Sequence, residues 1–507
     1  MVLIVCGCGA QQPDGYLHLR LASNPSTLDP ALITDVASST LAAKLFNGLV
    51  RLNGDLEVIP DISERWSLSD DGCLYRFVLR PDVRFPDGRP VRADDILYSF
   101  QRVVHPHTRS PNAWIFENVL GAVEYRQGKA EAVKGFRVID ERTFEITLRQ
   151  PFSPFLRMLT MSPAFIVQRE TVERLGAQFA HEPSGTGPFS LSRWDPDREL
   201  VLVKKNTYFG GEANVRGISY RIIPEDLTML TEFESGNLDI IPLPAAAFSK
   251  FMADMRWKDN ILTLQGMNTY YLGMNCARPP MADARLRRAV SLAIDRRKIL
   301  ETFYENRGRL AFGPVADLLR RWQSASSVAP FDQATARSLV RSAGADGMVL
   351  QLYVTADQEV IDLAEIVQAY LKQVGLNVHI KQLEWSAYKA AINQGEADIF
   401  WLSWWADYPD PENFLFPLFH SSNHGAAGNR TRYTNRTVDR LIEQGQAALT
   451  DSERNEFYRK AEELIVKDAP WVFMWHKNEY VVKQPWVENF RVYPVYTTDK
   501  GLEIVIR

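Results

Sequence analysis

The chain has little of what a disulfide scaffold, a membrane span or a nucleic-acid surface would need. Four cysteines among 507 residues cannot staple a fold of this size. Apolar residues make up 46% of the chain, yet no run of about 18 occurs, so the sequence predicts no membrane-spanning helix. The 58 basic and 62 acidic side chains give a net charge of -4, whereas a nucleic-acid binder would show a basic surplus. We therefore expect a globular protein with several cores and no nucleic-acid partner.

The sequence also lacks the short motifs of common enzyme classes. It contains no H-E-x-x-H, no G-x-S-x-G, no G-x-x-x-x-G-K-[ST] and no paired C-x-x-C. Two close histidine pairs, His105 with His107 and His420 with His424, have no cysteine nearby, so solvated loop histidines are the simpler interpretation. We expect no catalytic residue, no metal site and no cofactor.

Aromatic residues are plentiful, with 12 Trp, 18 Tyr and 26 Phe, which suits a large core or a wide ligand cleft. The most unusual window is 401–414, WLSWWADYPDPENF, in which a predicted strand ends in two indoles, an aspartate and a proline-set turn. In open α/β sheets the carboxyl ends of strands face the ligand crevice. We expect Trp404, Trp405 and Asp407 to project toward a ligand.

The chemistry of this window leaves alternatives open. A carboxylate among indoles is costly to desolvate alone, and a ligand ammonium would offset that cost with a charge-assisted hydrogen bond. Equally, the indoles could belong to the core while Asp407 caps its own turn. A third interpretation uses Asp407, Asp410 and Glu412 as the acids of a glycosidase, but working carboxylates face each other across a bond, which neighbours on one short loop seldom do.

An alternation of strands and helices is clearest in the last third of the chain. Residues 348–354 alternate as a strand does, 360–374 carry an apolar stripe at helical spacing, and 376–380 alternate again. This pattern predicts a βαβ unit with parallel strands. A helix over 386–393 and a strand over 398–403 continue the alternation. The sequence therefore predicts an α/β fold.

Shorter elements are expected in the first part of the chain. Tyr16–Leu21 alternates as a half-buried strand, and 38–40 (Ser-Ser-Thr) can cap a helix. A helix begins at Ala93, and 136–148 has the pattern of a hairpin. We interpret 184–188 (Ser-Gly-Thr-Gly-Pro) as a rigid break where the chain crosses between domains.

The first residues have the pattern of the end of a secretory signal, because an apolar run meets small residues beside a cysteine. Val5-Cys-Gly-Cys8 resembles a bacterial lipobox, in which Cys8 would be lipidated and become the new N-terminus. No basic segment precedes the run, and the alternative is an apolar tail without a role. We expect export and lipidation at Cys8.

After residue 16 the chain resembles the bacterial oligopeptide-binding proteins, the extracytoplasmic receptors of peptide ABC importers. The resemblance rests on short motifs that occur in the family's order along nearly the whole chain. They are Ser26-Thr-Leu-Asp-Pro30, Phe85-Pro-Asp-Gly88, Ala93-Asp-Asp95, Gly185-Thr-Gly-Pro188, Asn206-x-Tyr208, Gly236-Asn-Leu-Asp239, Thr269-Tyr-Tyr-Leu-Gly-Met-Asn275, Asp283-x-Arg-x-Arg-Arg-Ala289, Trp404-x-Ala-Asp-Tyr408, Ser421-Ser-Asn423 and Asp468-Ala-Pro470.

The resemblance implies a bilobed α/β fold of the type II, Venus-flytrap periplasmic-binding-protein architecture, with an extra middle domain. We expect residues 1–15 to form a signal remnant or lipid-anchor tail. Lobe I would comprise 16–46, 168–268 and 480–507, the extra domain 47–167, and lobe II 269–479.

The resemblance also implies a function. The protein would be a monomeric receptor in the periplasm or on the outer face of the cell membrane, without chemistry of its own, which delivers oligopeptides to the permease subunits of an ABC importer. The peptide would lie extended between the lobes and pair through its backbone, and the lobes would close on it. The residues implied in binding are Asp407, which would pair with the peptide α-ammonium, and Trp404, Trp385, Tyr270, Tyr271 and Asn423.

One departure keeps other ligands open. Peptide binders of this family can carry a basic residue near the strand before the aspartate, but here Trp401 and Leu402 occupy the strand and Ile392 lies on the preceding helix. Similar family members bind nickel complexes or oligosaccharides, and near-adjacent indoles suit sugar stacking. Peptide is the favoured ligand, an oligosaccharide or metal chelate is the alternative, and a glycan hydrolase comes third.

Overall fold

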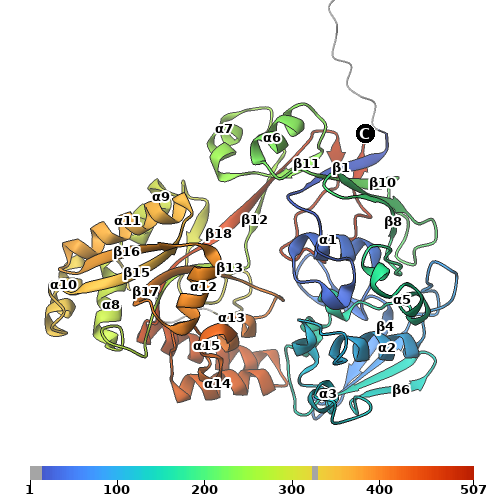
Figure 1. The fold of residues 1–507 in the computed structure, drawn as a ribbon, viewed down its shortest axis with the longest axis horizontal. Coiled ribbons are helices and arrows are strands. Elements are labelled where there is room, and N and C mark those ends of the chain that lie inside the picture. The colour runs from blue at the N-terminus through green and yellow to red at the C-terminus, as the bar shows by residue number, and fades with distance from the viewer. Residues whose placement is uncertain (1–13, 323–328) are drawn as a thin grey trace, which may run out of the picture.

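The chain folds into two halves, seen in a computed structural model that describes residues 14–322 and 329–507 (Figure 1). The halves are joined at one end by strands that pass from one to the other. The predicted bilobed α/β architecture is confirmed. Cys8, the predicted lipidation site, lies outside the described residues, and its lipidation stays a prediction. Within the described ranges, no helix has the length and apolar character that a membrane span requires.

One twelve-stranded sheet runs through both halves, in the order β16-β15-β17-β13-β18-β11-β1-β10-β9-β8, with β12 and β14 also pairing with β18. The long strand β18 belongs to both halves. Its first part pairs with β13 and β14, and its last part with β11 and β12. The halves therefore share one continuous strand. These strands are β11 (Ile240–Pro242), β12 (Ile261–Gln265), β13 (Asn268–Met274), β14 (Gly308–Leu310) and β18 (Trp471–Lys483).

The half built around β15, which we call the β15 half, contains the predicted βαβ unit. β15 (Val349–Thr355) and β16 (Asn377–Leu383) pair in parallel, and α11 (Gln358–Gln373) connects them, as the periodicity predicts. The next predicted helix and strand are confirmed as α12 (Trp385–Gln394) and β17 (Ile399–Trp405). Both β15 and β16 end at the edge of the sheet where β17 ends, because β17 is parallel to β15.

Helices cover the two faces of the sheet in the β15 half (Figure 1). After β17 the chain continues into three helices that lie below this sheet in Figure 1, next to the other half of the molecule. The helices of this half are α8 (Ala284–Ala293), α9 (Arg296–Thr302), α10 (Gln333–Ser342), α13 (Glu412–Phe419), α14 (Arg436–Ala447) and α15 (Asp451–Asp468).

The other half, which we call the β1 half, begins with β1 (Tyr16–Leu21), as predicted. The expected cap at 38–40 is wrong, because α1 (Val36–Leu45) begins two residues earlier. The Asp35 side chain accepts a hydrogen bond from the Ser38 backbone N–H at 2.8 Å, so an aspartate caps the helix and Ser38 is buried within it. The remaining strands of this sheet are β8 (Phe189–Asp195), β9 (Glu199–Lys204) and β10 (Gly217–Ile222).

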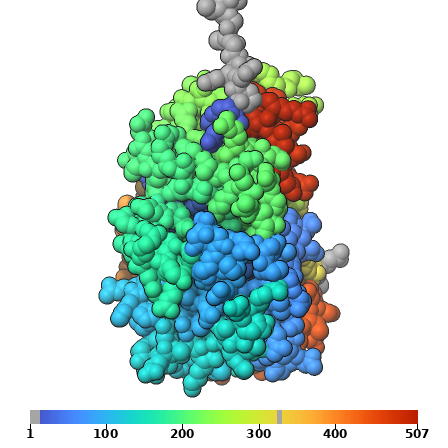
Figure 2. Space-filling model, turned by 90° about the vertical axis from the view of Figure 1, so that its right-hand side faces the viewer, coloured from blue at the N-terminus to red at the C-terminus, as the bar shows by residue number. Residues whose placement is uncertain are grey.

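A separate four-stranded sheet, in the order β4-β5-β7-β6, lies below the β1 sheet and has its own core. We call it, with α2 to α4, the four-stranded region. The predicted hairpin is confirmed by the antiparallel pairing of β6 with β7, and the predicted helix begins at Ala93. Figure 2 shows the right-hand side of the molecule as drawn in Figure 1. The N-terminal segments, blue to green, cover most of it. The elements are β4 (Ser63–Leu68), β5 (Leu74–Leu79), β6 (Phe136–Asp140), β7 (Thr143–Thr147), α2 (Ala93–Val104), η2 (Ala113–Phe116), α3 (Ala122–Arg126) and α4 (Phe155–Met158).

Shorter elements complete the described chain and connect the larger ones. They are β2 (Val50–Leu52), β3 (Val58–Pro60), α5 (Arg169–Leu175), α6 (Asp226–Glu234), α7 (Phe248–Ala253), β19 (Val487–Glu488) and β20 (Val505–Ile506).

The Gly-Thr-Gly motif at 185–187 touches the C-terminal end of α1. A Cβ atom on Gly187 would lie 2.4 Å from the Lys44 carbonyl oxygen and 2.7 Å from the Phe46 backbone nitrogen. The Thr186 hydroxyl donates to Asn47 Oδ1 at 3.1 Å, which holds the motif against the helix end. Glycine is required here by the close approach of two backbones, which cannot move apart as a flexible side chain would.

We expect Gly187→Ala to lower the free energy of unfolding by roughly 1–3 kcal/mol, because the added methyl group overlaps backbone atoms. Chemical denaturation measures the change. Gly54→Ala is the matched control, since the nearest atom to its added Cβ is Tyr493 Cε1 at 3.4 Å, an ordinary contact. Equal stability of the two variants would contradict this account of the motif.

Candidate functional site

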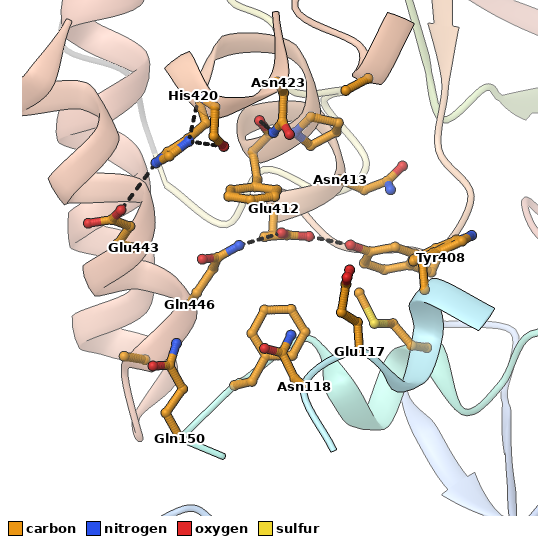
Figure 3. Close-up of a pocket in the computed structure, with 18 of the residues that line it drawn as sticks. Glu117, Asn118, Gln150, Tyr408, Glu412, Asn413, His420, Asn423, Glu443 and Gln446 are labelled. Carbon is orange, nitrogen blue, oxygen red and sulfur yellow. Dashed lines mark hydrogen bonds and ion pairs between the residues drawn. The ribbon is translucent and has the colours of Figure 1, made fainter. Parts of the chain in front are cut away.

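A cavity of about 1060 Å³ lies between the four-stranded region and the end of the β15 half (Figure 3). One wall comes from η2 and the segment that follows β7. The other wall comes from the turn after β17 and from α13 and α14. Apolar rings line both walls, and several polar side chains point between them. The rings are Trp114, Phe152, Trp404 and Phe416, and the polar side chains include Glu117, Asn118, Asp407, Asn423 and Glu443.

Asp407 lies on the turn between β17 and α13, and its side chain is exposed to the cavity. Its carboxylate Oδ2 accepts a hydrogen bond from Asn413 Nδ2 at 3.3 Å, and its backbone N–H donates to Asn413 Oδ1 at 2.9 Å. The protein packed around the Asp407 carboxylate removes part of its hydration. This desolvation raises the pKa of Asp407, and the Asn413 hydrogen bond opposes the rise. The site thus presents a carboxylate without a cationic partner from the described chain.

Behind this turn lie two buried acidic residues, Asp410 and Glu412. Asp410 forms an ion pair with Arg454 of α15, and Arg157 of the four-stranded region lies 3.6 Å from Asp410. The Tyr408 hydroxyl donates to Glu412, and Gln446 Nε2 donates to Glu412 Oε1 at 2.7 Å (Figure 3). Burial, together with the charge of Asp410, raises the pKa of Glu412 to about 7. These interactions hold the turn in place.

This arrangement does not support the expectation of a glycosidase. Asp410 is fully buried in its ion pair and does not border the cavity. Asp407 and Glu412 come from the same wall, so they do not face each other across a bound glycosidic bond, as the two acids of a glycosidase do.

Three of the predicted site residues lie around one cavity: Trp404, Asp407 and Asn423. Trp405 does not border it, because side chains alternate along β17, and its indole is 40% exposed elsewhere. Trp385 begins α12 and is 52% exposed, with its ring 6.0 Å from that of Tyr388. The cavity therefore brings together only part of the predicted set.

The two predicted tyrosines of β13 point to different surroundings. Tyr271 is 1% exposed and stacks on Trp471 inside the core, so we do not propose it as a ligand contact. Tyr270 is half-buried, with its ring 6.0 Å from that of Trp401 and 4.7 Å from Lys477 Nζ. Neither borders the cavity at Asp407.

The expectation of solvated loop histidines is wrong for His420. This side chain is buried at the cavity wall, and its ring nitrogens lie 2.7 Å from Ser422 Oγ and 3.2 Å from Glu443 Oε1. Among the described residues, no three His, Cys, Asp or Glu side chains converge as they would around a metal ion.

Sequence reasoning missed the far wall and Asn413. Trp114 and Glu117 come from the four-stranded region, and Glu117 points across the cavity toward Tyr408 and Glu412 (Figure 3). No sequence signal connects positions so far apart. Asn413 offered a weak signal, because it is a polar residue in the first turn of an apolar helix.

We expect Glu412→Gln to flatten the dependence of stability on pH. The folded protein holds the Glu412 proton up to about pH 7, whereas the unfolded chain loses it near 4.5, so the free energy of unfolding falls as pH rises between these values. The contribution is roughly 3 kcal/mol at most. Denaturation at several pH values from about 5 to 8 measures it.

Glu462, also buried and with its pKa raised to about 7, keeps part of the slope in that variant. Glu117→Gln is the control, because Glu117 is an exposed carboxylate on the opposite wall of the cavity and its loss should leave the pH dependence of stability unchanged. A slope unchanged by Glu412→Gln would show that burial does not hold this carboxyl protonated.

Known proteins resemble this chain over most of its length. The family described as bacterial extracellular solute-binding proteins, family 5 Middle, matches residues 57–426. The probable D,D-dipeptide-binding periplasmic protein DdpA of Escherichia coli K12 is 27% identical, over 96% of this chain and 93% of that protein. Heme-binding protein A of Haemophilus influenzae is 27% identical, over 92% and 88%. The solved structure of the periplasmic murein tripeptide binding protein MppA, in its unliganded open form, has a TM-score of 0.83 and 26% identity, and covers 97% of each chain.

Proposed function

The chain belongs to the bacterial extracellular solute-binding proteins of family 5, and on this basis we propose that it is a receptor that binds oligopeptides outside the cytoplasm and delivers them to an ABC importer. Two of the relatives named above bind a dipeptide and a murein tripeptide according to their names, which supports a peptide ligand. The observation that carries the proposal is the Asp407 carboxylate, which borders a cavity between the two halves without a cationic partner from the described chain.

The α-ammonium of a peptide fits this carboxylate chemically. It forms a charge-assisted hydrogen bond and restores the interaction that desolvation takes from Asp407. Trp404 and Asn423 border the same cavity and are proposed contacts for the first residues of the ligand. Trp385, Trp405 and Tyr270 lie on the same half outside this cavity, and we propose them as contacts farther along an extended peptide.

The sharing of β18 by both halves supports a hinge mechanism. We propose that the halves close on the peptide and that the peptide backbone pairs with the protein as an added strand does. Recognition through the backbone tolerates many peptide sequences, since every peptide carries the same groups. Closure would then present both halves to the permease subunits of the importer.

The remaining parts of the proposal follow from this role. The protein is a monomer in the periplasm or on the outer face of the cell membrane, and it binds its ligand without converting it. Lobe I comprises 16–46, 168–268 and 480–507, the extra domain comprises 47–167, and lobe II comprises 269–479. The four-stranded region lies within the proposed extra domain.

Peptides should stabilise the folded protein, because a ligand that binds only the folded state adds RT ln(1 + [L]/Kd) to the free energy of unfolding. At about a hundredfold excess over Kd this is about 2.7 kcal/mol, which a thermal melt with di- to pentapeptides detects. Mass spectrometry of the purified protein under native conditions identifies any ligand that remains bound. A heme, an oligosaccharide or a metal chelate in place of peptide, with no peptide stabilisation, would refute the proposed ligand.

Asp407→Asn should weaken the binding of peptides with a free amine by roughly 2 kcal/mol or more, about 30-fold in Kd, since the ammonium loses its charged partner. N-acetylated peptides should bind the variant and the wild type alike. Isothermal titration calorimetry measures both. Asp82→Asn removes an exposed carboxylate that does not border the cavity and serves as the control. Unchanged binding of free-amine peptides by the Asp407 variant would remove this residue from the site.

A further inference from the structure

We infer that Asn413 is a positioning residue of the ligand site, which orients the Asp407 carboxylate and leaves one of its oxygens open for the ligand ammonium. The inference rests on the proposed function. It assigns a role to a side chain that neither the sequence motifs nor the resemblance singled out.

The buried side-chain amide of Asn413 connects several groups of the candidate site. Asn413 is 4% exposed and borders the cavity. Its Oδ1 accepts from the Asp407 backbone N–H at 2.9 Å and from Trp404 Nε1 at 3.3 Å, while its Nδ2 donates to Asp407 Oδ2 at 3.3 Å. Both proposed contacts for the peptide amine end, an indole and a carboxylate, are therefore tied to the same amide.

One carboxylate oxygen of Asp407 remains available to a ligand. Oδ2 of Asp407 receives the Asn413 donor, whereas no donor in the described part of the chain reaches Oδ1. No lysine or arginine within the described ranges forms an ion pair with Asp407. An ammonium group approaching from the cavity meets Oδ1 as the acceptor that is still available.

Asn413 is itself held rigidly. Its backbone N–H donates to the Asp410 carbonyl at 3.1 Å, and Asp410 is fixed by the buried ion pair with Arg454. The next residue toward the N-terminus, Glu412, is held by Tyr408 and Gln446. Asp410 and Glu412 therefore form the buried platform from which Asn413 reaches the Asp407 carboxylate.

The chemistry of the amide suits this position. A hydrogen bond donated to a carboxylate favours its charged form, so Asn413 lowers the pKa of Asp407 against the effect of desolvation. The titratable and charged groups that face this part of the cavity do not take over that function, because none of them forms a hydrogen bond or an ion pair with Asp407 among the described residues. They are Tyr408, Glu412, His420, Arg440 and Glu443 on the near wall, and Glu117 and Arg149 on the far wall.

The test is Asn413→Ala, with trialanine as the probe and calorimetry at several pH values from about 4.5 to 8. We expect the affinity of the folded variant at neutral pH to fall about tenfold or more, since a hydrogen bond to a charged group is lost. We also expect the pH below which trialanine binding declines to move upward, because Asp407 takes up its proton more readily without the donor. Asn53→Ala is the matched control, since Asn53 Nδ2 also donates to a carboxylate, Glu57 Oε2 at 2.9 Å, away from this cavity.

Each result decides one question. Wild-type protein that binds no peptide refutes the proposed function. Wild-type binding together with an Asn413→Ala variant of equal affinity and equal pH dependence refutes the inference alone. A loss of affinity that is the same at every pH assigns Asn413 a structural role only, and this also overturns the inference. If the alanine variant melts at a lower temperature, Asn413→Ser, which keeps a polar group but cannot span both partners, repeats the comparison by the same criteria.

Discussion

The ion pair between Asp410 and Arg454 determines the shape of the turn on which the candidate site depends. Both side chains are buried, and a buried charge that lost its partner would cost several kcal/mol. The pair therefore fixes α15 against the start of α13, and with it the amide of Asn413 and the carboxylate of Asp407. The turn that carries the candidate site is thus held by two charges that do not border the cavity.

The abundance of aromatic residues is mostly a property of the cores rather than of a cleft. In the four-stranded region the rings of Phe100, Phe116, Phe136 and Phe144 contact one another at centroid distances of 4.7–6.0 Å. In the core of the β15 half, Tyr271 and Trp471 stack with their rings parallel. Only a few rings, such as Trp114 and Trp404, border the cavity. The number of aromatic residues in a sequence does not indicate whether their rings lie in a core or in a cleft.

Local signals in the sequence predicted much of the fold. The periodicity of 348–380 was sufficient for the βαβ unit, because the strands alternate and α11 buries one regular stripe. The start of α1 was misplaced because Asp35 competes with Ser38 for the cap, and both residue types serve that role. At the site, the end of β17 pointed to Trp404 and Asp407. The sequence did not reveal that Tyr271 is buried, because β13 is covered on both faces. The far wall depends on contacts between distant segments, which no local pattern encodes.

The shared strand β18 has a consequence for folding. Its thirteen residues supply pairing partners to four other strands, two in each half. If either half melted, one end of β18 would lose its neighbours and the adjoining strands would lose theirs. Two halves that share a strand in this way are expected to unfold as one cooperative unit.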